Sequence, residues 1–318
     1  MFEKDPSFYT PEMKKEIFDF VSFLESELSK FDPLNKRSYE EVRHEQEEGL
    51  GRFPAPVLSE KATERTITSP NGPILIRMFI PEDEIKGIYY HVHGGGWVLG
   101  RAHHSDPILE AISIKCGVVV ASVDYRLAPE HPYPAPNDDC ENAALWVINE
   151  LAKEFKTNKV VIGGESAGAH LALTTMLRLR DKHGYTGFAG ANLVYGVYDL
   201  MGSPSAYLWG DRNLILSTPI MQWFTNHYVE PGDIRRSSDV SPLYANLDNM
   251  PKAFFTVGTQ DPLHDDTVFM YHRWRSAGNE AKAEVYEGAT HGFERQPTQL
   301  AEAVLERMRN FISDCLGD

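Results

Sequence analysis

The chain has 318 residues, 42% of them hydrophobic and 24% charged, a composition that excludes a disordered or fibrous protein and allows one large domain with attachments. Its formal net charge of -15 argues against nucleic acid and anionic lipid as partners. The three cysteines, Cys116, Cys140 and Cys315, are too few and too scattered for a disulfide framework or a cysteine-based zinc site.

The N-terminal region favours helix. Its first ten residues, MFEKDPSFYT, lack the charged-then-apolar order of a signal peptide, and no stretch of the chain approaches the roughly eighteen apolar residues of a membrane span. We therefore expect a cytoplasmic protein. Residues 11–30 repeat apolar side chains at steps of three and four, which predicts an amphipathic helix, and residues 37–48 predict a second helix. We expect residues 1–55 to form one part of a helical cap.

Strand and helix then alternate along most of the chain. Short apolar runs predict strands at 74–80, 87–92, 118–123, 159–164, 191–196 and 252–258. Helix-length stretches follow at 106–116, 136–153, 167–182, 263–277 and 298–315. This alternation predicts an α/β fold with a mostly parallel sheet and helices on both faces, built from residues 56–199 and 249–318.

The stretch 200–248 interrupts the alternation, because no strand pattern appears in it. A helical signal from Ser217 to Val229, with Pro219 near its start, is the clearest element there. We expect residues 200–248 to be an insertion that lies over the sheet and completes the cap with the N-terminal helices.

The sequence GESAG, residues 164–168, follows a predicted strand directly and precedes a predicted helix. G-x-S-x-G in this context is typical of a nucleophile elbow, in which glycines permit the crowded turn that exposes the serine. The letters alone are weak evidence, since a tight turn with a surface serine would have the same pattern. With strand and helix in place, Ser166 is the predicted nucleophile.

A second glycine-rich segment, His93-Gly94-Gly95-Gly96-Trp97, follows the strand at 87–92. Successive glycines leave backbone N–H groups unobstructed, and such donors stabilise the oxyanion of an acyl-transfer intermediate. We expect Gly95, Gly96 and Ala167 to supply them. A flexible turn or a phosphate loop is the alternative, although the lysine of a P-loop is missing.

A serine hydroxyl needs a base held by an acid before it can attack at neutral pH. Asp261 follows the strand at 252–258, and His291 follows the short β-rich run AKAEVYE. The resulting chain order, Ser166, Asp261, His291, is the order that α/β-hydrolase topology imposes. Asp265 and Asp266 are alternatives for the acid, and Asp265 is also a candidate for holding the loop in place.

The segments HGGGW, DYRLAPEHPYPA, GESAG, SPLYA, DPLHDD and HGF occur between about residues 87 and 293. On these segments the chain resembles the hormone-sensitive-lipase-like family of α/β-hydrolases, in particular its bacterial acetyl esterase members. The resemblance implies the α/β-hydrolase fold, a helical cap, a Ser-Asp-His triad and hydrolysis of carboxylic esters. It implies no cofactor.

Two segments depart from that family's usual pattern. Glu165 stands where the family commonly has aspartate in the elbow, which keeps the charge and lengthens the arm. His103-His104-Ser105-Asp106 stands where many relatives have a threonine-histidine-aspartate step. We expect the first change to leave catalysis intact and the second to alter the mouth of the pocket.

Several other residues admit more than one interpretation. With His103 and His104 nearby, His91 and His93 could suggest a metal site, but we expect none. Instead we expect His93 to brace the glycine loop through a hydrogen bond and His91 to be an ordinary buried or interface histidine. Three aromatic residues are candidates for the pocket wall, with the protein core as the alternative: Trp97, Trp209 and Phe293.

The predicted function is hydrolysis of short acyl esters, acetyl to hexanoyl, through an acyl-enzyme. The same residues would serve an amide, lactone or carbamate hydrolase, a thioesterase or an acyltransferase. A ligand-binding protein on the same scaffold is a further alternative, although such proteins typically lose a triad member. The expected partner is a small-molecule ester, and the sequence leaves the oligomeric state open, a homodimer included.

Overall fold

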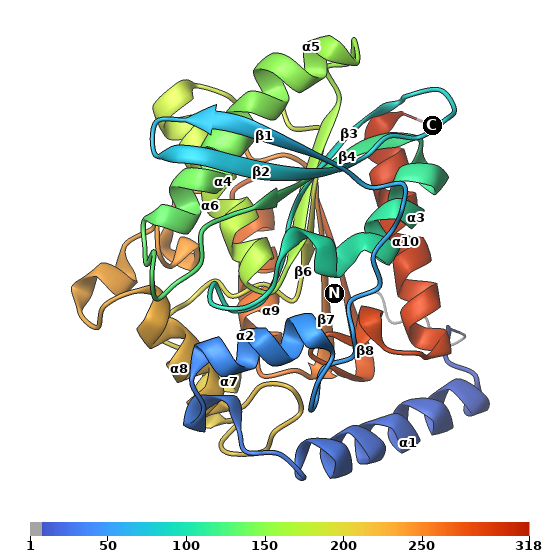
Figure 1. Cartoon of the computed structure of the whole chain (residues 1–318), viewed down its shortest axis with the longest axis vertical. Helices are drawn as coiled ribbons and strands as arrows, with labels where there is room; N and C mark the ends of the chain where they lie inside the picture. The colour runs from blue at the N-terminus through green and yellow to red at the C-terminus, as the bar shows by residue number, and fades with distance from the viewer. Residues whose placement is uncertain (1–7, 318) are drawn as a thin grey trace.

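The computed structural model describes residues 8–317 and has one eight-stranded sheet at its centre (Figure 1). The strand order is β1-β2-β4-β3-β5-β6-β7-β8. β1 and β2 form an antiparallel hairpin, β2 pairs antiparallel with β4, and the remaining pairs are parallel. The strands are β1 (Thr63–Ser69), β2 (Gly72–Phe79), β3 (Gly87–Val92), β4 (Val118–Asp124), β5 (Val160–Glu165), β6 (Gly190–Val194), β7 (Ala253–Gln260) and β8 (Ala281–Thr290).

Helices cover both faces of this sheet. On one face α3 packs with α10, and on the other α4 packs with α6 and α9 contributes to the same core cluster (Figure 1). A π-helical turn joins α4 to a short α5. Their bounds are α3 (Asp106–Cys116), α4 (Ala135–Trp146), α5 (Ala152–Glu154), α6 (Ala167–His183), α9 (His264–Ser276) and α10 (Gln299–Leu316). The predicted α/β fold is confirmed.

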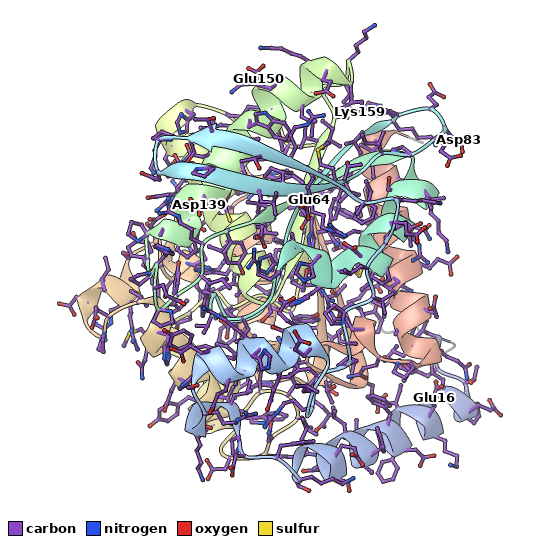
Figure 2. All side chains as sticks on the ribbon, in the orientation of Figure 1. Glu16, Glu64, Asp83, Asp139, Glu150 and Lys159 are labelled. Carbon is purple, nitrogen blue, oxygen red and sulfur yellow. The ribbon has the colours of Figure 1, made fainter. Side chains whose placement is uncertain are left out.

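The central strands are buried because both of their faces are covered. Residues 118–123 of β4 are all buried, which explains why their sequence is a continuous apolar run. The sequence did not predict β1 as a separate strand. Its residues, TERTITS, are mostly polar, since β1 lies at the edge of the sheet and buries only Ile67. Charged side chains such as Asp83 and Glu150 point away from the body of the molecule (Figure 2).

Four further helices lie beyond the carboxyl ends of the parallel strands, and we call them the cap: α1 (Pro11–Leu28), α2 (Tyr39–Glu48), α7 (Pro204–Leu208) and α8 (Thr218–Tyr228) (Figure 1). Thr10, Ser38 and Ser217 cap the N-termini of α1, α2 and α8 through their side-chain oxygens. α1 packs against β8, and α7 against α8. Residues 1–7 of the expected N-terminal cap segment lie outside the described residues.

In the described part of the chain, no helix is both long enough and apolar enough to cross a bilayer.

Candidate active site

Ser166 lies between β5 and α6, in the turn where the sequence predicts a nucleophile elbow. Its backbone has φ 56° and ψ -121°, a conformation that residues other than glycine rarely adopt. The flanking glycines allow the turn to pack against β3. A Cβ atom on Gly164 or Gly168 would lie 2.4 or 2.0 Å from the carbonyl oxygen of Val92. Both positions therefore require glycine.

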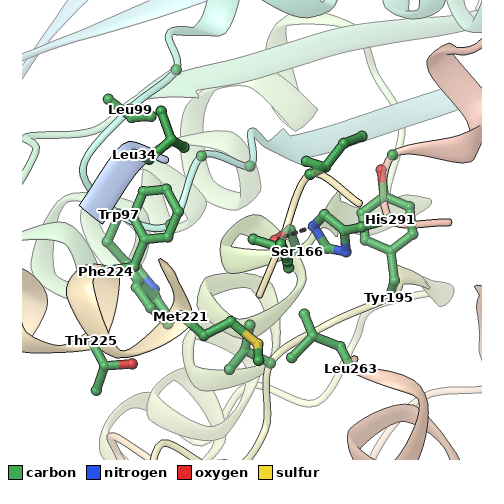
Figure 3. Close-up of a pocket in the computed structure, with 18 of the residues that line it drawn as sticks. Leu34, Trp97, Leu99, Ser166, Tyr195, Met221, Phe224, Thr225, Leu263 and His291 are labelled. Atoms are coloured by element: carbon green, nitrogen blue, oxygen red, sulfur yellow. Dashed lines mark hydrogen bonds between the residues drawn. The ribbon is translucent and has the colours of Figure 1, made fainter. Parts of the chain in front are cut away.

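The structure brings Ser166, His291 and Asp261 into one hydrogen-bonded line, of which Figure 3 shows the contact between Ser166 and His291. His291 Nε2 lies 3.0 Å from Ser166 Oγ, and His291 Nδ1 lies 2.9 Å from Asp261 Oδ2. The other oxygen of Asp261, Oδ1, accepts a hydrogen bond from the backbone N–H of Leu263 at 2.9 Å. Asp261 is 1% exposed and His291 6% exposed, so water has little access to the contact between acid and base.

The competing carboxylates, Asp265 and Asp266, point elsewhere. Asp265 Oδ2 accepts from the N–H of Ser205, while Asp266 Oδ1 accepts from the N–H groups of Tyr198 and Asp199. Both side chains therefore hold the segment that follows β6. Burial raises the pKa of Asp266 to about 7, although the hydrogen bonds that it accepts oppose the shift.

The glycine loop adjoins the serine. Gly95 and Gly96 have φ values of 119° and 60°, and a Cβ atom on Gly96 would lie 2.2 Å from the ring of Phe224 in α8. Among the described residues, the N–H groups of Gly95, Gly96 and Ala167 have no hydrogen-bond acceptor. Gly94 differs, because its N–H donates to Glu165 Oε1 at 3.0 Å. The N–H groups of the three predicted donors are thus available to a substrate oxygen.

Glu165 connects this loop to two other groups. Besides the Gly94 N–H, its carboxylate contacts His91 Nε2 at 2.9 Å and accepts from Arg295 Nη2 at 2.7 Å. Burial disfavours the charge, but His91, Arg295 and the Gly94 N–H together lower the pKa of Glu165 to about 2. The side chain next to the nucleophile is therefore an anion at neutral pH that fixes the start of the glycine loop.

The histidines near the loop have separate roles. His93 Nδ1 lies 2.8 Å from the carbonyl oxygen of Gly94, and its ring stacks on Tyr125 with centroids 4.2 Å apart, which confirms the predicted bracing contact. Burial lowers the pKa of His93 to about 4, so its ring is neutral. His91 lies between Ser122 and Glu165, and His103 and His104 contact Glu47 instead. The four histidines do not form one cluster.

A cavity of about 890 Å³ opens above Ser166 and His291, between the strand ends and the cap (Figure 3). Leu24, Leu28, Met221 and Phe224 line it from the cap, Leu34 lines it from the turn between α1 and α2, and the predicted pocket residue Trp97 lines it from the glycine loop. The cavity is largely apolar with a few polar groups, which is typical of a site for a small molecule.

Two of the three aromatic pocket predictions need correction. Trp209 is not among the residues that line the cavity, because its indole Nε1 turns to the carbonyl oxygen of Arg212 at 2.7 Å. Phe293 is 1% exposed and packs in the core with Tyr195 and Tyr286. Neither side chain therefore lines the cavity.

A family described as having the α/β-hydrolase fold matches residues 89–295, about two thirds of the chain. The chain belongs to the α/β-hydrolases. An acetyl esterase of Salmonella schwarzengrund is 30% identical to this hydrolase over 258 residues, which are 78% of each chain. The carboxylic ester hydrolase LipN of Mycobacterium tuberculosis is 30% identical over 250 residues, 76% of this chain and 66% of LipN.

Solved structures agree with this membership. An esterase of the archaeon Pyrobaculum calidifontis superposes on the hydrolase with a TM-score of 0.83 and 29% identity, covering 93% of this chain and 97% of the esterase. The carboxylesterase EstE1, from a metagenomic library, gives a TM-score of 0.80 and 26% identity, covering 89% and 99%.

Sequence reasoning missed two residues of this α/β-hydrolase site. Tyr195, at the end of β6, has φ 36° and places its ring 4.4 Å from the ring of His291. Arg295 reaches Glu165 from the turn after His291. In the sequence, Tyr195 was marked only by its position after a predicted strand, and Arg295 only by its position after His291. No pattern indicated that these two side chains point toward the site.

Proposed function

We propose that this α/β-hydrolase is a serine carboxylesterase that hydrolyses esters of short acyl groups, acetyl to hexanoyl, without a cofactor. The hydrogen-bonded line from Ser166 through His291 to Asp261 carries the proposal, because it opens into an apolar cavity beside free backbone donors. Nucleophile, base and acid within hydrogen-bond reach are what acyl transfer requires.

In the proposed mechanism, His291 Nε2 takes the proton of Ser166 as Oγ attacks the ester carbonyl. The N–H groups of Gly95, Gly96 and Ala167 stabilise the oxyanion that forms. Asp261 keeps the proton of the neutral imidazole on Nδ1 and stabilises the imidazolium. His291 then protonates the leaving alcohol, and a water molecule activated by the same ring releases the acid from Ser166.

The boundaries of the cavity support the proposed preference for small acyl groups. Phe224 of α8 lies against Gly96, so the cap limits the space directly above the oxyanion donors. Relatives named acetyl esterase and carboxylic ester hydrolase support the same substrate class. The three cysteines are free thiols, which is compatible with the cytoplasmic location that we include in the proposal.

Matched substrates test the proposal. Turnover of p-nitrophenyl acetate, butyrate and hexanoate should exceed that of p-nitrophenyl palmitate, and the butyrate ester should exceed butyryl p-nitroanilide by orders of magnitude. Faster cleavage of the anilide would assign the chain to amide hydrolysis. Failure to cleave any of the short esters would overturn the esterase proposal.

A further inference from the structure

Three potential metal ligands meet where the cap joins the core. Glu47 lies on α2, and His103 and His104 lie on the 3₁₀ turn Ala102–Ser105, at the mouth of the cavity. Their ligand atoms all lie within 4.8 Å of one another. His103 Nε2 is 3.0 Å from Glu47 Oε2, and His104 Nε2 is 3.0 Å from Glu47 Oε1, so each carboxylate oxygen faces a different imidazole.

Hydrogen bonding alone does not account for His104. Its Nε2 lies close to Glu47 Oε1 but at an angle that makes no hydrogen bond, and its Nδ1 has no partner among the described residues either. Both nitrogens are shielded from solvent, and the side chain is only 13% exposed. The Nε2 atom thus faces Glu47 without a hydrogen bond of good geometry, and a buried polar atom left in this state is costly.

The neighbouring residues hold the three ligands in place. On α2, Gln46 accepts from the N–H of Gly100, and Arg43 donates to the carbonyl oxygen of Val98, so the helix is tied to the glycine loop. Arg295 donates to the carbonyl oxygen of His104 and to Ser105 Oγ. A site whose framework is already fixed loses little conformational entropy when an ion binds.

We propose that Glu47, His103 and His104 form a binding site for one Zn²⁺ ion, or a transition-metal dication of similar chemistry. Two imidazoles and one carboxylate form a ligand set that suits Zn²⁺ and disfavours Mg²⁺ and Ca²⁺, which prefer oxygen ligands alone. Tetrahedral zinc with bonds of about 2.0–2.1 Å separates its ligand atoms by roughly 3.3 Å, so small side-chain shifts suffice. Water would complete the coordination. The sequence-based expectation of no metal is revised here.

The ion would act on the cap rather than in the chemistry. It would link α2 to the 3₁₀ turn Ala102–Ser105. Arg295 donates to the carbonyl oxygen of His104 in that turn and also contacts Glu165, the neighbour of Ser166. Zinc binding would therefore stabilise the closed junction between cap and core. It requires neither Ser166 nor His291, so it does not depend on the esterase proposal.

Isothermal titration of the chelator-treated full chain with zinc chloride tests the site. We expect one zinc ion per chain with a micromolar or smaller Kd. Glu47→Gln and His104→Gln should each weaken binding at least about tenfold, as ligand loss does. Zinc at about 100 times the wild-type Kd should raise the melting temperature of the wild type by roughly 5 °C and that of Glu47→Gln by at most about half as much.

His183→Gln is the matched control, since His183 makes the same kind of contact, 2.8 Å from Glu141, without a second histidine. It should bind zinc like the wild type. His103→Asn, at a half-buried side chain, is a third ligand variant in case His104→Gln misfolds. Absence of stoichiometric binding, or wild-type affinity in Glu47→Gln and His103→Asn, would overturn the proposal.

Discussion

The strand ends that carry the triad and the cap that faces them are held together in different ways. On the strand side, buried groups meet at fixed hydrogen-bond distances, with Asp261 and His291 almost fully enclosed. On the cap side, α1 buries only Met13, Ile17 and Leu28, and the contact from Glu25 to Arg212 is about half exposed. The proposed chemistry thus relies on a network of buried contacts, whereas α1, at the wall of the cavity, is held by fewer of them.

Asp261→Asn should produce the largest loss. The asparagine amide would donate to His291 Nδ1 and favour the tautomer that cannot accept the serine proton, which lowers kcat by roughly 10³–10⁴-fold in such triads. Steady-state hydrolysis of p-nitrophenyl acetate measures the loss. Asp265→Asn is the control, because the Asp265 carboxylate contacts Ser205 and His264 and not His291. Equal activities of the two variants would contradict the assignment of the acid.

Asp266→Asn changes the buried carboxyl group that holds the segment after β6. Because the folded pKa of Asp266 is raised to about 7, the folded chain keeps a proton that the unfolded chain releases above about pH 4. The free energy of unfolding of the wild type should therefore fall between about pH 4 and pH 7, by at most about 4 kcal/mol from this group. The variant should lack this decline. Urea unfolding at pH 4.5 and 7.5 tests it, and identical pH dependences in both proteins would contradict the shift.

Glu165→Gln should have a smaller effect on the strand side. Loss of the charge weakens the contacts with His91 and Arg295 that fix Glu165 against the Gly94 N–H, so we expect kcat to fall about tenfold with little change in KM. Glu165→Asp keeps the charge and should retain more activity. Glu284→Gln, another buried carboxylate on β8, is the control for stability. A kcat unchanged in Glu165→Gln would remove Glu165 from the positioning of the loop.

Arg212→Gln should have the smallest effect. Arg212 joins Glu25 of α1 to Gln260 at the end of β7, but exposed ion pairs contribute only about 0–1 kcal/mol. Thermal unfolding should shift by no more than a few degrees, and kcat for acetate esters should stay the same. A large loss of kcat would show that the cap is coupled to the chemistry more tightly than its contacts indicate.

The strand ends and the cap also differ in how well the sequence predicts them. The proposed triad residues follow strands, and parallel strands run in one direction, so their carboxyl ends lie at one edge of the sheet. Local patterns were therefore sufficient to predict that the three side chains lie close together. The direction of a side chain near the cap depends on how distant segments pack together. The prediction that Trp209 and Phe293 line the cavity was wrong for this reason. The approach of Glu47 to His103 depends on how α2 docks, and no spacing along the chain encodes that contact.

Labelling with a fluorophosphonate, followed by peptide mass spectrometry, tests the role of Ser166 most directly. A serine activated by a base and facing oxyanion donors reacts readily with this tetrahedral mimic. We expect a single labelled residue, Ser166, no labelling of Ser166→Ala, and strongly reduced labelling of His291→Ala with an unchanged circular dichroism spectrum. Labelling of a different serine, or hydrolysis of acetate esters by His291→Ala at the wild-type rate, would contradict the proposed site.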